Sequence, residues 1–285
     1  MKSILGVIGG SGLYQLGVPT EKIAVETPFG KPSSDLHKAQ IGDTTLYFIA
    51  RHGEGHTISP PELNNRANIY ALKKMGAKVV LSISAVGSLR EEIVPGDFVL
   101  PEQYLDLTKG RVSTFFGEGV AGHAHFADPA CKPLGERLAG VIKSIGVKVH
   151  VGGTYVCMEG PQFSTRAESH WYRGWDLGGE KRRTVVIGMT AMPEAKLARE
   201  ARLCYHTIAM ATDYDCWKGD ADVSVEAIIK VLKANVGNSQ KLIQAIAKDP
   251  PLPCGNCWHA MEHAVMTPKE LWPKHRAAAL ETILE

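Results

Sequence analysis

Ile4-Leu5-Gly6-Val7-Ile8-Gly9-Gly10-Ser11-Gly12 is an apolar run that ends in a glycine-rich turn. A short run without polar alternation is typical of a strand buried on both faces, and the glycines after it predict a tight turn. The pattern recurs in Thr45–Ala50, Lys78–Ser84, Phe98–Pro101, Gly153–Met158, Val185–Met189 and Thr207–Ala211. Strands of this kind belong to sheets that helices cover on both sides.

Helical periodicity separates these strands. It is found in Pro61–Met75, Lys132–Ile145, Thr165–Trp175, Pro193–Leu203 and Ser224–Ala247. Strands that alternate with helices predict an α/β fold. Residues 1–285 contain no repeat, low-complexity tract or Pro/Ser-rich linker, so we predict a single domain.

Two segments depart from this alternation. Tyr104–Ala127 is rich in Gly, Thr and His and has weak periodicity. It is predicted to be a long loop, of a kind that usually serves function or an interface. Residues 249–285 begin with a stretch rich in Pro, Cys and Trp, Asp249–Pro273, which predicts irregular structure. A final helix is predicted over Lys274–Leu284.

Charge and hydropathy exclude several classes of function. The sequence has 32 Lys and Arg against 30 Asp and Glu, a formal net charge of +2. These charges are dispersed, so we expect no nucleic-acid partner. No apolar run reaches the roughly 20 residues that span a bilayer, and the first one turns to glycine too early for the core of a signal peptide. We therefore expect a cytoplasmic protein that does not bind membranes.

Six cysteines in a chain of this length are too few for a secreted disulfide scaffold. Cys254 and Cys257 lie close to His259 and His263, and both residue types bind zinc. A two-Cys, two-His finger separates its pairs by about 12 residues, whereas these pairs almost touch, so we predict no metal site. Free thiols and disulfides are both compatible with Cys131, Cys204, Cys254 and Cys257.

The glycine turn after the first strand is a candidate anion site. Its backbone N–H groups and the Ser11 hydroxyl can surround a phosphate without a charged side chain. A dinucleotide-binding fingerprint that starts at Gly10 would need glycine at position 15, which is Gln15. The remaining alternative is a plain glycine turn without a ligand.

A second candidate, Arg51-His52-Gly53-Glu54-Gly55-His56, follows an apolar strand. Arg51 offers a two-pronged donor for an oxyanion, and His52 lies beside it. The Arg-His-Gly triplet also resembles the motif of the histidine phosphatases, in which the histidine is phosphorylated. That family places the motif on its first strand, whereas here another strand precedes it. A solvated loop is a third interpretation.

Hydroxyl-bearing residues end two further strands. Ser84 and Ala85 lie at the end of one, and Thr190 follows another. The carboxyl ends of parallel strands line the crevice in which α/β proteins hold ligands. We therefore expect these residues to face one cleft together with Ser11, unless each hydroxyl only caps the helix that follows it.

An aromatic residue and a pair of carboxylates are candidates for binding a flat base. Phe163 precedes a capping box, Thr165-x-x-Glu168, and offers a stacking surface. Asp213 and Asp215 follow the last predicted strand, and in an extended segment a spacing of two places both carboxylates on one face. An Asp-rich surface turn is the alternative interpretation.

Taken together, five motifs resemble those of the trimeric purine nucleoside phosphorylases, in particular the branch that cleaves methylthioadenosine. They are RHGEGH (51–56), ISAVGSL (83–89), MEGPQFSTRAE (158–168), GMTAMPEAKLAREA (188–201) and ATDYDCW (211–217). The resemblance extends to about Leu242 and implies a single domain with a central mixed, largely parallel sheet flanked by helices. It also implies a homo-oligomer, a trimer or a dimer of trimers.

The activity that this resemblance implies is phosphorolysis of S-methyl-5'-thioadenosine to adenine and 5-methylthioribose 1-phosphate, a reaction of purine and methionine salvage. Neither a metal nor a cofactor is expected. Broader specificity, for adenosine or methylthioinosine, is the alternative. Two departures lie outside the implied ligand residues: a longer segment around Trp175–Arg183, and tail cysteines typical of thermophile-like relatives, in which cysteines form disulfides.

The same resemblance implies two sets of ligand residues. Phosphate is expected against Ser11, Arg51, His52, Ser84, Ala85 and Thr190. The nucleoside is expected against Phe163, Met189, Asp213, Asp215, Val225, Ile228 and Ile229, with His123 reaching in from a neighbouring subunit.

The chemistry suggests roles for some of these residues. The purine must leave with the bonding electrons while phosphate approaches the opposite face of the sugar. We expect Asp215, with a pKa raised by burial, to protonate N7, and Asp213 to accept from the 6-amino group. Val225, Ile228 and Ile229 are predicted to share one helix face and to form an apolar wall for the methylthio group, unless this stripe is ordinary core.

Overall fold

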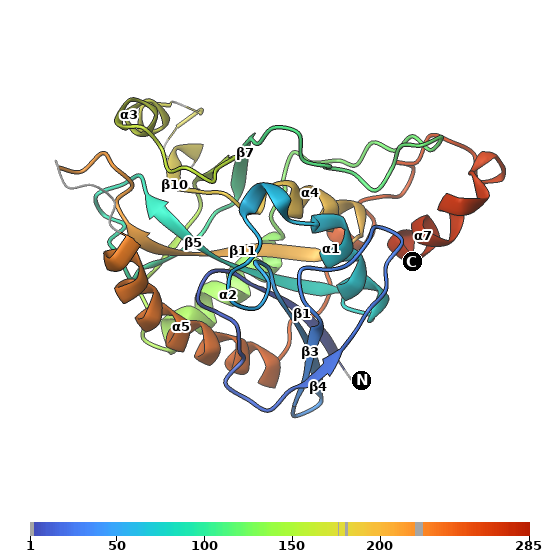
Figure 1. The fold of residues 1–285 in the computed structure, drawn as a ribbon, viewed down its shortest axis with the longest axis horizontal. Coiled ribbons are helices and arrows are strands. Elements are labelled where there is room, and N and C mark those ends of the chain that lie inside the picture. Colours follow the sequence, from blue (N-terminus) through green and yellow to red (C-terminus); the bar gives the residue numbers. More distant parts are fainter. Residues whose placement is uncertain (1–2, 176, 180–181, 220–224) are drawn as a thin grey trace.

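The computed structural model describes residues 3–175, 177–179, 182–219 and 225–285. One mixed sheet runs through this described part of the chain (Figure 1). Its strands are β1 (Ser3–Gly9), β2 (Glu21–Ile23), β3 (Leu36–Ile41), β4 (Thr44–Ala50), β5 (Val79–Ser88), β6 (Phe98–Leu100), β7 (Gln103–Leu107), β8 (Val149–Val151), β9 (Thr154–Met158), β10 (Thr184–Gly188) and β11 (Cys204–Asp213).

Helices cover both faces of the sheet, as the apolar strands predicted. The helices of the described residues are α1 (Asn65–Lys74), α2 (Lys132–Ser144), α3 (Arg166–Arg173), α4 (Ala191–Glu200), α5 (Val225–Lys248), α6 (Gly255–Trp258) and α7 (Lys274–Leu284), with short 3₁₀ turns η1 (Pro60–Glu62) and η3 (Lys269–Leu271). In Figure 1, α2 and α5 lie on one side of the central strands and α1 and α4 on the other. Val7 and Ile8, successive residues of β1, accordingly point into two separate cores.

The topology brings several strand ends together. β4, β1, β5 and β11 run parallel as neighbours in that order. β10 pairs with the end of β5 in the antiparallel direction, through Ile187 opposite Gly87, and β9 and β7 continue beyond β10. The carboxyl ends of the four parallel strands therefore lie at the same edge of the sheet, beside the end of β10.

Every strand and helix predicted from apolar runs is present, with ends displaced by a few residues. β2, β3, β7 and β8 were not predicted, because they are short or rich in polar residues. Tyr104–Ala127 is consequently not a loop throughout, since residues 104–107 belong to β7. The tail contains the short helix α6, and α7 has the predicted bounds. Among the described residues, no helix is long and apolar enough to cross a membrane.

The segment after β7 is held against the tail. Gly122 and Val265 form a bridge, the His123 N–H donates to the Ala264 carbonyl at 2.8 Å, and the Met266 N–H donates to the Ala121 carbonyl at 2.9 Å. These backbone contacts determine the course of the loop that carries His123.

Candidate active site

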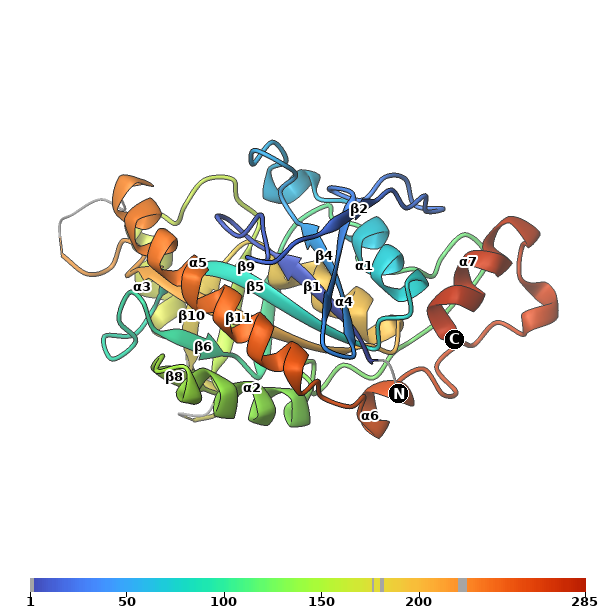
Figure 2. The same cartoon turned by 90° about the horizontal axis from the view of Figure 1, so that it is seen from below.

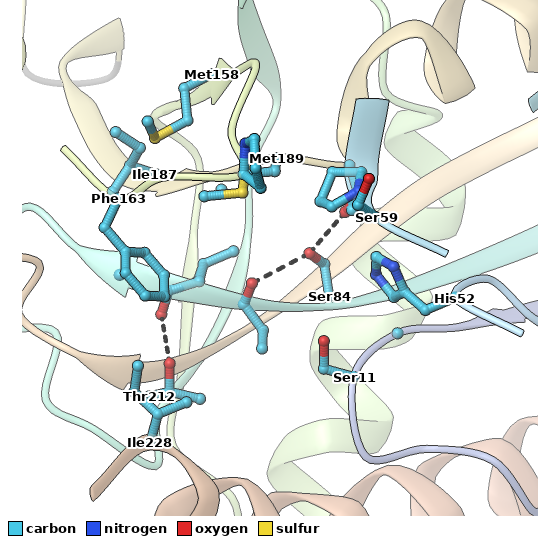
Figure 3. A pocket seen from close by; sticks show the side chains of 18 of the residues that line it. Ser11, His52, Ser59, Ser84, Met158, Phe163, Ile187, Met189, Thr212 and Ile228 are labelled. Atoms are coloured by element: carbon cyan, nitrogen blue, oxygen red, sulfur yellow. Dashed lines mark hydrogen bonds between the residues drawn. The ribbon is translucent and has the colours of Figure 1, made fainter. Parts of the chain in front are cut away.

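A cavity of about 440 Å³ opens where β1, β4, β5 and β11 end. This volume lies in the range of small-molecule sites. All six residues predicted to bind phosphate line it, namely Ser11, Arg51, His52, Ser84, Ala85 and Thr190. In Figure 3, Ser11, Ser84 and His52 lie at one end of the cavity, and Phe163, Thr212 and Ile228 lie at the other.

Hydroxyl groups converge at the first end. Ser84 Oγ lies 3.0 Å from Thr190 Oγ1 and 3.4 Å from the Tyr155 hydroxyl. The glycine turn packs tightly against the backbone of β5, because a Cβ at Gly10 would lie 2.5 Å from the Ile83 carbonyl oxygen. The expectation that separate strand ends meet in one cleft is confirmed, although β10 approaches β5 from the opposite direction.

The contacts of Arg51 differ from the prediction that its two-pronged face holds an oxyanion. Its guanidinium is fully buried and its fork is directed at Glu194, with Nε donating to Oε2 at 2.9 Å and Nη2 to Oε1 at 3.3 Å. Nη2 also donates to Ser82 Oγ at 2.7 Å, and Nη1 donates to the Ile83 carbonyl at 2.9 Å. The two-pronged face expected to hold an oxyanion therefore binds a carboxylate of α4.

This pairing determines what Arg51 offers to a ligand. Burial lowers the pKa of Arg51, but the charge and hydrogen bonds of Glu194 outweigh it and raise the pKa overall. Four of the five guanidinium N–H groups donate to described residues, which leaves one N–H on Nη1 for a ligand. Because Glu194 neutralises Arg51, the donors that remain at this end of the cavity are mostly neutral, namely hydroxyls and backbone N–H groups.

His52 is neutral near pH 7. Burial, followed by the charge of Arg51, lowers the pKa of its imidazole to about 4. Nδ1 lies 2.9 Å from the Ile58 carbonyl oxygen, which can only accept, so Nδ1 carries the proton and Nε2 carries a lone pair. The ring stacks on His56 at 4.4 Å between centroids, and His56 Nδ1 bonds to the Tyr14 hydroxyl at 2.9 Å. His52 therefore lines the cavity as a neutral ring with one acceptor nitrogen, Nε2.

Asp213 and Asp215 form the polar group at the other end. Asp213 Oδ2 accepts from Thr212 Oγ1 and Oδ1 accepts from the Asp215 N–H, both at 2.7 Å. Asp215 Oδ2 is buried and has no hydrogen-bond partner within the described structure. Burial raises the pKa of both carboxyl groups.

Asp213 and Asp215 line the same cavity for a different reason from the one predicted. β11 ends at Asp213, and Asp215 has a left-handed backbone with φ of 51°. A tight turn, and not an extended strand, therefore brings them together. They approach β5 closely, because a Cβ at Gly87 would lie 3.1 Å from Asp213 Oδ1 and 3.2 Å from Asp215 Cβ.

The predicted nucleoside residues divide into two groups. Phe163, Met189 and Ile228 line the cavity. Ile229 is 45% exposed and is not part of its lining, so the structure does not place it in the site. His123 is exposed and also lies outside this cavity. The side chain of Val225 lies outside the described residues.

Two supporting residues were missed from the sequence. Glu194, inside the periodic helix α4, accepts from Arg51, Ser82 and the Tyr205 hydroxyl, and a buried carboxylate in an apolar stretch was the available signal. Arg111, on the segment after β7, donates to the carbonyls of Met189 at 2.7 Å and Glu159 at 2.6 Å. It joins the loops that carry Met189 and Phe163, and no local motif indicated this role.

Residues 4–248 match the model of the phosphorylase superfamily. The chain belongs to this family. This membership contradicts the interpretation of Arg51-His52-Gly53 as a histidine phosphatase motif, because the match covers most of the chain.

Relatives within the family are similar along most or all of their length. The S-methyl-5'-thioadenosine phosphorylase of Geobacter sulfurreducens is 47% identical, and the alignment covers 100% of this chain and 99% of the relative. A solved structure of a methylthioadenosine phosphorylase from an antarctic soil metagenomic library is 42% identical with a TM-score of 0.89, and all of both chains is covered. The Schistosoma mansoni methylthioadenosine phosphorylase in complex with adenine is 35% identical with a TM-score of 0.76, covering 85% of this chain and 90% of that one.

Proposed function

We propose that this phosphorylase cleaves S-methyl-5'-thioadenosine with inorganic phosphate, giving adenine and 5-methylthioribose 1-phosphate. The observation that carries the proposal is a single cavity with two unlike ends. Neutral hydrogen-bond donors gather at one end, and Asp213 and Asp215 lie at the other beside the aromatic ring of Phe163. A nucleoside held between the ends would place its sugar carbon next to the phosphate.

Phosphate is the nucleophile in this scheme. Ser11, Ser84 and Thr190 would donate to its oxygens together with the free N–H of Arg51 Nη1. The lone pair of His52 Nε2 would accept from the O–H of a protonated phosphate or from a ribose hydroxyl. The charge of the bound anion is then distributed over several short contacts, and the attacking oxygen is positioned below the sugar.

The purine is the leaving group. As the bond between the sugar carbon and N9 breaks, its electron pair passes into the purine ring and a phosphate oxygen bonds to the carbon. Asp215, whose buried Oδ2 has no partner in the described chain and whose pKa is raised, would transfer its proton to N7. Asp213 already accepts two hydrogen bonds, which favour its ionised form, and would accept from the 6-amino group.

Specificity follows from the same two groups of contacts. A carboxylate facing C6 favours an amino group over a carbonyl, because a carbonyl would be left unpaired and repelled. Ile228 lines the cavity from the first turns of α5 and would contact the apolar 5' substituent. Both features favour a 6-amino nucleoside with a methylthio group.

The enzyme is proposed to act as a homotrimer, or as a dimer of trimers, in the cytoplasm, with neither nucleic acid nor membrane as a partner. In such an assembly, exposed His123 would complete the cavity of a neighbouring subunit from the loop that the tail supports. Because phosphate itself is the nucleophile, the chemistry needs no cofactor at the reacting atoms.

The decisive experiment measures adenine release from S-methyl-5'-thioadenosine with and without inorganic phosphate, and identifies the sugar product by mass spectrometry. We expect adenine and a pentose 1-phosphate only when phosphate is present. Release of adenine without phosphate would indicate a hydrolase, and binding without release would indicate a non-catalytic module. Either result would refute the proposal.

A further inference from the structure

Four cysteine side chains meet at a place remote from the cavity. The Sγ atoms of Cys131, Cys204, Cys254 and Cys257 all lie within 4.8 Å of one another. Cys131 precedes α2, Cys204 begins β11, and the other two belong to the tail at α6; Figure 2 shows α2 and α6 on the same side of the molecule. We propose that this four-cysteine cluster binds zinc and fastens the tail to the sheet.

The sulfur positions agree with a shared centre. Cys254 Sγ lies 3.5 Å from Cys131 Sγ and 3.6 Å from Cys204 Sγ. Zinc–sulfur bonds of about 2.3 Å place the four sulfurs of a tetrahedral site about 3.8 Å apart, whereas the sulfurs of a disulfide are about 2.05 Å apart. Since Cys254 is almost equidistant from two partners and all six cysteines are free, the arrangement is that of one four-thiol unit.

The surroundings of the sulfurs favour thiolates. The Cys254 N–H donates to Cys204 Sγ at 3.0 Å, and the Cys257 N–H donates to Cys254 Sγ at 3.5 Å. Metal-bound thiolates are commonly oriented by N–H donors of this kind. The cluster is shielded from water, because Cys131, Cys204 and Cys257 are buried. The spacing Cys254-x-x-Cys257 is also that of one ligand pair in a structural zinc site.

Cationic groups surround the residue that follows Cys257. Four thiols that bind Zn²⁺ release four protons and leave a centre with a net charge of −2. Trp258, which directly follows Cys257, is surrounded by Lys73, Lys78 and Arg202, whose cationic groups lie 5.5, 4.6 and 4.3 Å from its ring centroid. Burial lowers the pKa of Lys73 and the negative charge of Glu285 opposes this shift, although no ion pair joins the three cations to a carboxylate within the described residues. An anionic metal centre would add negative charge close to this group of cations.

In the sequence, Cys254 and Cys257 have only His259 and His263 as nearby candidate ligands. His259 instead pairs with Glu262 at 3.2 Å, and the fold replaces the histidines with Cys131 and Cys204. A site closed by four thiolates has no open position, so its role is structural. It would tie the tail to the first residue of β11 and thereby support the backbone contacts around His123.

Metal analysis of the full-length chain, purified reduced from a zinc-supplemented culture, tests the proposal. We expect about one zinc per chain, with the cluster thiols protected from alkylation until a chelator is added. Cys254→Ser should lower the zinc content at least about tenfold, since losing a ligand is more disruptive than losing a supporting contact. Cys216→Ser, outside the cluster, is the matched control and should keep its zinc.

A second measurement covers the case in which Cys254→Ser does not fold. The wild-type chain is stripped of metal under reducing conditions and titrated with Co²⁺ alone, and tetrahedral thiolate binding is expected to give thiolate-to-cobalt charge transfer and intense visible bands at one ion per chain. Three results would each overturn the proposal. They are iron in place of zinc, six freely alkylated thiols without metal, and a disulfide that joins Cys131 or Cys204 to the tail in the freshly purified chain.

Discussion

The substitution Arg51→Lys tests whether Arg51 mainly stabilises the fold, as its buried hydrogen bonds indicate, or mainly binds an oxyanion, as the sequence suggested. A simple oxyanion clamp would lose phosphate affinity but little stability, because lysine keeps the charge. In the structure, however, the guanidinium makes four hydrogen bonds to three different partners, Glu194, Ser82 and the Ile83 carbonyl. A single ammonium group cannot reach both sides of this arrangement.

The loss of stability in Arg51→Lys can be estimated from these hydrogen bonds. If two of the four are lost, at about 1.5–3 kcal/mol for each hydrogen bond to a charged group, the free energy of unfolding falls by about 3–6 kcal/mol. An unfolding entropy of about 2.1 cal/mol/K per residue gives about 0.6 kcal/mol/K for a chain of this length, so Tm falls by about 5–10 °C. The phosphate KM should also rise, because the remaining N–H of Nη1 is removed.

Thermal unfolding at one protein concentration and phosphate saturation kinetics measure the two effects. Arg137→Lys is the matched control, because Arg137 is half-exposed and pairs with exposed Asp249, where such pairs contribute little. The structural role would be refuted if the Tm of Arg51→Lys lay within about 1 °C of the control and only the phosphate KM changed. The guanidinium would then serve mainly to bind phosphate.

Three further outcomes are expected. Asp215→Asn should lower kcat for methylthioadenosine by about 10²-fold or more, and the difference from wild type should shrink for an analogue that lacks N7; unchanged kinetics would exclude Asp215 as the acid. His52 has a pKa of about 4, below its ordinary 6.5, so between these pH values the unfolded chain binds a proton that the folded chain does not. The free energy of unfolding should therefore fall by about 2 kcal/mol from pH 7 to pH 5. Urea titrations of His52→Gln should lack this loss, and a pH profile equal to that of the wild type would show that His52 is not the titrating group. Ile228→Asn should lower the ratio of kcat/KM for methylthioadenosine over adenosine by an amount equivalent to about 1–3 kcal/mol, and a constant ratio in a folded variant would place Ile228 in the core.

Local sequence patterns carry enough information for the central architecture. β1, β4, β5 and β11 are almost entirely buried on both faces, and each contains an apolar run that is a strong signal of such a strand. β3, Leu36-His-Lys-Ala-Gln-Ile41, has buried residues at only two of six positions. Strands of this kind depend on pairing with a neighbour, which the local sequence does not contain.

Long-range partners account for what was missed in the site. Periodicity places Glu194 on a helix, but its partner Arg51 lies 143 residues away in the chain. The spacing of Asp213 and Asp215 predicted that they lie close together. The left-handed turn that brings them together could not be predicted, because Asp215, and not a glycine, occupies the left-handed position. The ligand-spacing rule likewise treated Cys254 and Cys257 with their sequence neighbours, although their partners in space come from α2 and β11.

The tautomer of His52 has a consequence for which anions the enzyme can use. In the proposed binding mode the lone pair of His52 Nε2 faces the bound anion, so it favours an oxyanion that still carries a hydrogen and repels one that does not. Near neutral pH phosphate and arsenate retain at least one proton, whereas sulfate has none, although all three are tetrahedral and similar in size. We therefore expect arsenate to replace phosphate as a co-substrate and sulfate to be a poor competitor, so that the site selects anions by protonation more than by shape or charge.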